Sequence, residues 1–177
     1  MLSPSIARLS GVLKSLAWTT IAITAAGCAY ALSRAPVQMS QWVTAHSGAP
    51  QTWAFSTLSL ILWGALVVVL AASGIYVLWR LATLFALYQK GEALSDAAAR
   101  AIRLAGVGLI VRAGLGVLAR PLESLIVTLD APAGQHMVAI AFDASDLWLV
   151  LAGGLVLVIG AVTRDAVAIA RENEAFV

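Results

Sequence analysis

Three charged residues, Arg112, Arg120 and Glu123, lie in an otherwise apolar stretch, residues 104–129. Arginine and glutamate in such a setting can form an ion pair, or can line a polar path for an ion or a solute. Arg120 and Glu123 are spaced i,i+3 across Pro121 and are expected to pair, whereas a continuous helix would place Arg112 about 16 Å from Glu123. The sequence leaves open a structural role, a functional polar pocket, or a membrane boundary inside this stretch.

A second set of side chains could bind a cation, because carboxylates and histidines are common ligands of calcium and zinc. Their spacing matches no metal motif, and Asp146 is explained as the cap of a following helix. The chain also lacks nucleophile motifs and phosphate-binding glycine loops. We therefore predict a solvated loop without a metal site, no cofactor, no catalytic residue and no enzymatic activity. The set comprises Glu123, Asp130, His136, Asp143 and Asp146, with His46 on another loop.

The composition is that of a membrane protein. Hydrophobic residues make up 61% of the 177 positions and charged residues 11%, whereas soluble domains contain about 45–50% and about 25%. The apolar runs predict an all-α chain with four transmembrane helices, at about 15–33, 53–79, 104–125 and 147–166. Residues 1–177 then form a single integral membrane domain with outer loops at about 34–52 and 130–146, and the second loop contains an alternating segment, HMVAIAFD, that could form a short strand.

The first span has a second interpretation. Arg8 and Lys14 precede it, as expected for a transmembrane helix with a basic flank. The segment Ala25–Cys28 also resembles the cleavage box of a bacterial lipoprotein signal peptide. The sequence leaves open whether this span is cleaved, and either outcome leaves the other three spans unchanged.

The second and third helices are too long for the membrane alone. A continuous helix from Trp53 to Tyr88 would measure about 50 Å, against a hydrocarbon core of about 30 Å. We predict that both helices continue into the cytoplasm as a helical hairpin, about 80–103, with its turn at Lys90–Gly91. Ser95 is the expected N-cap of the third helix, with Asp96 in the first turn.

Basic residues predict the orientation of the chain, because lysine and arginine concentrate in cytoplasmic segments. Only Arg34 lies clearly on the opposite side of the spans. Both termini, the hairpin and the tail at about 167–177 are therefore predicted to be cytoplasmic. The basic residues on that side are Arg8, Lys14, Arg80, Lys90, Arg100, Arg103, Arg164 and Arg171.

Small residues and an amphipathic tail indicate helix contacts. Glycines and alanines recur in the third and fourth spans, including Gly106, Gly153 and Gly160, and they favour either close packing within the chain or a dimer interface. In the tail, Val162, Ala166, Ile169 and Ala170 share one helix face. That face could pack on the hairpin, lie on the membrane or bind a soluble partner.

Several segments together resemble a bacterial family of four-span inner-membrane proteins known only as a domain of unknown function. They are YQKGE from Tyr88, RPLESLIVTLDAPAG from Arg120, DLWLVLAGGLVLVIGAV from Asp146 and the ending ENEAFV. The outer loop departs from the family, because it reads DAPAG where asparagine and two prolines are usual. The resemblance implies the inner membrane as location, and a small helix-turn-helix regulator as a partner, since such regulators are often encoded beside these proteins.

Two functions are compatible with the sequence. The first is an interaction or regulatory protein that docks a cytoplasmic partner and contacts no nucleic acid directly. The alternative is a small transporter or channel subunit that uses Arg112, Arg120 and Glu123. In either case the lipid bilayer is a partner, and a homo-oligomer is possible. The candidate docking residues are Arg80, Lys90, Glu92, Arg100, Arg103, Arg171, Glu172 and Glu174.

Overall fold

The computed structural model describes residues 4–47, 51 and 53–174, and this part of the chain is all-helical, with no strand. In order along the chain, the helices are α1 (Pro4–Ser33), α2 (Ala35–Ser47), α3 (Thr57–Gln89), α4 (Asp96–Val127) and α5 (Ala144–Glu174). Helices α1, α3, α4 and α5 are each long and apolar enough to cross a membrane. The prediction of an all-α protein with four helices that are long and apolar enough to span a membrane is confirmed for the described residues.

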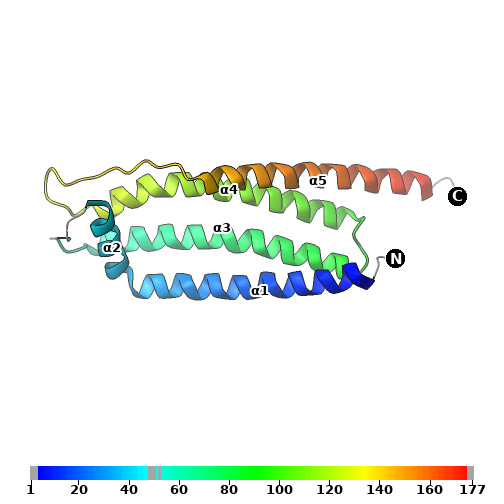
Figure 1. The fold of residues 1–177 in the computed structure, drawn as a ribbon, viewed down its shortest axis with the longest axis horizontal. Helices are drawn as coiled ribbons and strands as arrows, with labels where there is room; N and C mark the ends of the chain where they lie inside the picture. Colours follow the sequence, from blue (N-terminus) through cyan, green and yellow to red (C-terminus); the bar gives the residue numbers. More distant parts are fainter. Residues whose placement is uncertain (1–3, 48–50, 52, 175–177) are drawn as a thin grey trace.

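The four long helices form an open row rather than a closed bundle. Helix α1 packs on α3, α3 on α4, and α4 on α5, whereas within the described residues α1 packs on neither α4 nor α5 (Figure 1). Large apolar side chains such as Ile23, Ile61 and Leu155 are 62–66% exposed. In a bilayer, lipid chains cover such side chains without a free-energy penalty, so a row with two apolar faces is a stable arrangement there.

Helix α2 corrects the prediction of an irregular loop over 34–52. Residues 35–47 are helical, and Ala35, Met39 and Val43 are buried against Trp63 of α3 and Val127 of α4. The i,i+4,i+8 spacing of the three buried residues produces this apolar stripe. Pro36 does not prevent the helix, because it lies in the first turn of α2, where no backbone N–H donor is needed.

The connection between α3 and α4 follows the predicted turn chemistry. Lys90 is the C-cap of α3, and Gly91 has φ of 81°, a left-handed conformation that glycine adopts without strain. The Ser95 hydroxyl accepts a hydrogen bond from the Ala98 N–H, which makes Ser95 the N-cap of α4, and Asp96 lies in the first turn. The predicted turn at Lys90–Gly91 and the predicted Ser95 N-cap are confirmed.

Helices α4 and α5 pack along a seam of small residues. On α5, Asp146, Gly153, Gly160 and Val167 are buried at seven-residue intervals, the repeat that keeps one face of a helix toward a single neighbour. A Cβ added to Gly153 would lie 2.9 Å from the Gly106 carbonyl oxygen, so the two backbones are in direct contact. Gly106, Gly153 and Gly160 therefore serve packing within the chain, one of the two predicted roles.

The tail uses a different face from the predicted one. Val167 is the buried residue of the last turns, whereas Val162 is 63% and Ile169 60% exposed. The heptad seam continues from Gly160 to Val167 and therefore decides which side of the helix faces α4. The apolar face that contains Val162 and Ile169 consequently remains exposed.

The alternating segment after α4 is extended but forms no strand. Residues 135–143 run back along α4, where the Met137 N–H donates to the Thr128 hydroxyl (3.3 Å) and the Ala139 N–H to the Ser124 hydroxyl (2.9 Å). Two extended residues advance about 6.6 Å, and one helical step of four residues advances about 6 Å. This match lets alternate backbone groups bond to successive turns of a helix instead of to a neighbouring strand.

The two ends of the row differ in structure and are called the terminal end and the loop end. At the terminal end, α1 begins, α5 ends and residues 90–95 join α3 to α4; at the loop end lie α2 and residues 128–143 (Figure 1). Lipid-exposed irregular backbone is not tolerated in hydrocarbon, so residues 135–143 place the membrane boundary near Arg120. Arg103, the last charge before the apolar part of α4, is about 26 Å from Arg120 along the helix, close to the thickness of a hydrocarbon core.

Candidate functional site

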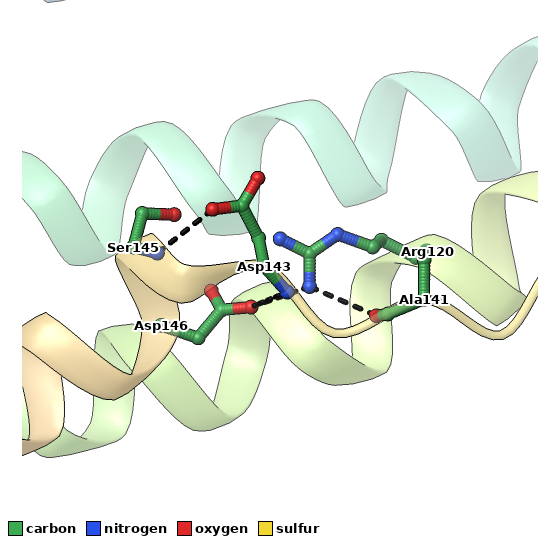
Figure 2. Close-up of polar contacts among 5 residues, drawn as sticks. All are labelled: Arg120, Ala141, Asp143, Ser145 and Asp146. Carbon is green, nitrogen blue, oxygen red and sulfur yellow. Dashed lines mark hydrogen bonds and ion pairs between the residues drawn. The ribbon is translucent and has the colours of Figure 1, made fainter.

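Arg120 lies at the centre of a polar cluster at the loop end. Its Nη1 donates to Asp146 Oδ2 at 2.5 Å and to the Ala141 carbonyl oxygen at 3.2 Å (Figure 2). The two side chains are only 28% and 12% exposed. The expected pairing of Arg120 with Glu123 is therefore wrong. Arg120 pairs instead with Asp146, which lies in the first turn of the neighbouring helix α5.

Asp143 and Asp146 share the capping of α5. The Ser145 N–H donates to Asp143 Oδ1 at 2.7 Å, and the Asp143 N–H donates to Asp146 Oδ2 at 3.3 Å (Figure 2). This is the reciprocal arrangement of a capping box. The N-cap is thus Asp143 rather than Asp146, which corrects the prediction. Hydrogen bonds from Ser145 lower the pKa of the Asp143 carboxyl below its usual range.

The other acidic residues of the loop end also have partners within the fold. Glu123 accepts a hydrogen bond from Trp63 Nε1 at 3.3 Å. Asp130 Oδ2 accepts from the Ser56 N–H at 2.7 Å and from the Ser59 hydroxyl at 2.6 Å. These bonds lower the pKa of Asp130 and tie the start of α3 to the end of α4. Each of these carboxylates is explained by a structural contact.

The two histidines lie apart and contact the backbone. His136 Nδ1 is 2.8 Å from the Thr128 carbonyl oxygen, while the ring of His46 stacks on Trp42 with centroids 4.0 Å apart. Among the described residues, no three histidine, cysteine, aspartate or glutamate side chains gather as metal ligands.

Arg112 is about midway between Arg103 and Arg120 along α4, near the centre of the apolar part. Its side chain extends toward the loop end, because Nη1 is 3.4 Å from the point that a Cβ on Gly116 would occupy. Asp146 Oδ1 is 3.0 Å from the same point. The missing Gly116 side chain thus gives the Arg112 guanidinium room to approach the Arg120–Asp146 pair, while Glu123 belongs to a different contact on α3.

The predicted docking residues fall into three groups at the terminal end. The first group is Arg80, whose guanidinium carbon Cζ lies over two aromatic rings, 4.6 Å from the centroid of the Trp79 ring and 5.0 Å from that of the Tyr76 ring. Arg171 pairs with Asp96 at 2.5 Å. The third group is exposed, with no ion pair to any residue whose side chain the structure describes: Lys90, Glu92, Arg100, Arg103 and Glu172. The side chain of Glu174 lies outside the described residues.

A groove between α4 and α5 brings several of these charges together. It has a volume of about 280 Å³ and is lined on α4 by Asp96, Ala99, Arg100 and Arg103, and on α5 by Leu157, Gly160, Ala161 and Arg164. Arg164 was not among the predicted site residues. The sequence could have indicated it, because Arg164 is the first charged residue after the fourth apolar run, just as Arg103 is the last one before the third apolar run.

The fold and its boundary charges define a class, the multi-span helical membrane proteins. Within that class the chain belongs to the family described as "Protein of unknown function (DUF2975)", whose model matches residues 15–177. This confirms the resemblance to a membrane family without an assigned function. No curated protein and no solved structure shows significant similarity to the chain.

Proposed function

We propose that this protein docks a soluble partner protein at its terminal end, that this end faces the cytoplasm, and that the membrane is the bacterial inner membrane. Eight of the eleven lysines and arginines belong to the terminal end: Arg8, Lys14, Arg80, Lys90, Arg100, Arg103, Arg164 and Arg171. Such an excess is characteristic of the cytoplasmic side.

The observation that carries the proposal is the Arg171–Asp96 ion pair at 2.5 Å. It joins the last turns of α5 to the first turn of α4, directly after the connection from α3. Exposed charges that are far apart in the sequence thereby share one surface, which we call the docking surface: Lys90, Glu92, Arg100 and Glu172 around the pair.

The docking surface is far enough from the membrane to meet a soluble protein. Helix α3 continues for nine residues beyond Arg80, and α5 for ten beyond Arg164, which correspond to about 14 Å and about 15 Å. The headgroup layer on one side of a bilayer is only about 5–8 Å thick. The last turns of α3 and the first turns of α4 would then form the cytoplasmic hairpin expected from the sequence.

The surface favours a partner with its own mixture of charges and a small apolar patch. Lys90 and Arg100 attract carboxylates, Glu92 and Glu172 attract lysines and arginines, and the exposed Ile169 offers apolar area on the same helix end. The family resemblance suggests a small helix-turn-helix regulator. Binding of this kind requires neither an enzymatic activity nor direct nucleic-acid contact of the membrane protein.

Co-purification tests the proposal. The full-length tagged protein is isolated from its own cells in mild detergent beside the double variant Lys90→Gln/Arg100→Gln and a loop-end control, Arg34→Gln. We expect a soluble protein with the wild type and the control, and at least a fivefold loss of it with the double variant. Equal recovery from all three, or no specific protein with the wild type, would contradict docking at this surface.

A transporter or channel subunit is the second candidate. The observation that favours it is the approach of Arg112 toward Asp146 near the middle of the apolar span. An open row of helices encloses no path by itself, so this function would also require a second copy of the chain. Flux in liposomes should fall with Arg112→Leu if this candidate is correct and should be absent for wild type and variant alike if it is not.

A further inference from the structure

We propose that the groove between α4 and α5 at the terminal end binds the phosphate group of an anionic phospholipid. The site consists of Arg103 on α4 and Arg164 on α5, which line the groove together with Arg100. This inference goes beyond docking of a soluble partner. The groove shares Arg100 with the docking surface, but its two central arginines, Arg103 and Arg164, do not belong to that surface.

The charge of the groove favours an anion. Three guanidinium groups line it with a single carboxylate, Asp96, and that carboxylate is engaged by Arg171 at 2.5 Å. Arg164 is 3.5 Å from Asp165, but the two side chains are 67% and 69% exposed, so water competes with this pair. The Arg103 side chain has no hydrogen bond or ion pair to any described residue. Positive charge is therefore left without a counterion.

The shape of the groove comes from small residues. A Cβ on Gly160 would lie 3.1 Å from the Arg103 backbone nitrogen, so the helices are in close contact there, and the small side chains of Ala99 and Ala161 leave the adjoining space unfilled. The volume of about 280 Å³ is near the lower limit of small-molecule sites, about 300 Å³, and suits a compact headgroup. Planar guanidinium groups bind phosphate oxygens through paired N–H donors.

The depth of the groove favours a lipid over a free phosphate. Arg103 and Arg164 are the charges that border the apolar parts of α4 and α5, which is the level of lipid phosphates. Leu157, which lies toward the apolar part of α5, also lines the groove. The nearby side chains Leu155 and Val158 are 63% and 61% exposed. An acyl chain can lie on this apolar surface while its phosphate meets the arginines.

Native mass spectrometry of the delipidated full-length protein tests the proposal. The protein is titrated with dioleoyl phosphatidylglycerol, with the zwitterionic phosphatidylcholine of the same chains, and with phosphatidylglycerol in the presence of inorganic phosphate. The groove variant is Arg103→Gln/Arg164→Gln. The matched control, Arg8→Gln/Lys14→Gln, removes the same charge from the same end but outside both the groove and the docking surface. Circular dichroism and gel filtration confirm folding.

We expect the wild type and the control to bind phosphatidylglycerol at least tenfold more tightly than phosphatidylcholine, and the groove variant to lose this preference. An equal loss in groove variant and control would show diffuse charge attraction and overturn the site. Full displacement by millimolar phosphate would overturn the lipid as occupant. Unchanged lipid binding with loss of a co-purifying soluble protein would make the groove a protein-docking site instead. If the double variant does not fold, Arg164→Gln alone, at an exposed position, provides the same comparison.

Discussion

The two ends of the helix row use their charges differently. At the loop end, Asp130, Asp146 and Glu123 each accept a hydrogen bond from a residue far away in the sequence, and Asp143 accepts one from the first turn of the helix that it caps. At the terminal end, the side chains of Arg100 and Arg103 are exposed and have no partner among the described residues, and the ion pairs Arg171–Asp96 and Arg164–Asp165 are both largely exposed.

This difference separates charges that hold the fold from charges that are available to ligands. A partly buried, hydrogen-bonded charge is costly to leave without its partner, whereas an exposed cation loses little when it is removed. The loop end is therefore the structural end, and the terminal end is the one at which we place both proposed binding activities. Substitutions at the two ends should give opposite patterns of stability and binding.

Loss of the Arg120 guanidinium should have the largest effect. Arg120→Ala leaves the Asp146 carboxylate buried without its cation, and we expect the free energy of unfolding to fall by about 2–3 kcal/mol. Arg103→Ala, on the same helix at the terminal end, should change it by less than about 0.5 kcal/mol. Thermal and denaturant unfolding in detergent measure both. Equal destabilisation by the two substitutions would remove the distinction between the ends.

The seam that connects the two ends offers a matched pair of glycines. A Cβ on Gly153 would lie 2.7 Å from Ile110 Cγ1 and 2.9 Å from the Gly106 carbonyl oxygen, whereas a Cβ on Gly154 would meet nothing within 4 Å. Gly153→Ala should destabilise the protein by about 1–3 kcal/mol through overpacking, and Gly154→Ala should be neutral or stabilising by up to about 1 kcal/mol. The same unfolding assay measures both variants. Similar changes in the free energy of unfolding for Gly153→Ala and Gly154→Ala would contradict close packing of α4 and α5 at Gly153.

The membrane class and the four spans follow directly from the sequence, because length and hydropathy alone determine which segments can cross a bilayer. Gly91, Ser95 and Asp96 were also assigned correctly, since turn and cap chemistry is local. The partner of Arg120 was not predictable, because the choice between Glu123 and Asp146 depends on how α5 packs against α4. Helix α2 was missed because its proline and polar residues are typical of loops, and only tertiary burial of Met39 and Val43 makes the helix stable.

The pH dependence of local opening should also differ between the ends. The pKa of Asp130 is lowered in the folded state by the hydrogen bonds from Ser56 and Ser59. The stabilisation is therefore present above the unfolded pKa of about 4 and is lost as the pH falls through the lower folded value. We expect hydrogen exchange at the starts of α3 and of the segment after α4 to accelerate below about pH 4 relative to residues 90–100. Asp130→Asn should abolish the pH dependence, and an unchanged profile would contradict this role.

The exposed pair at the terminal end should give the smallest effect on stability. The Arg171 and Asp96 side chains are 65% and 50% exposed, so Asp96→Asn should change the free energy of unfolding by less than about 1 kcal/mol. The same substitution should raise the mobility of the end of α5, measured by a spin label at Glu172→Cys in a Cys28→Ser background. A large loss of stability would place this pair with the structural charges of the loop end.

The most direct test of the account is the accessibility of its two ends in intact cells. Single cysteines are introduced in a Cys28→Ser background at Lys90 for the terminal end and at Ala133 for the loop end, and a membrane-impermeant maleimide is applied to spheroplasts before and after lysis. We expect labelling of Ala133→Cys in intact spheroplasts and of Lys90→Cys only after lysis. Labelling of both positions before lysis, or of Lys90→Cys alone, would contradict the assignment of the basic terminal end to the cytoplasm and the docking of a soluble cytoplasmic partner that depends on it.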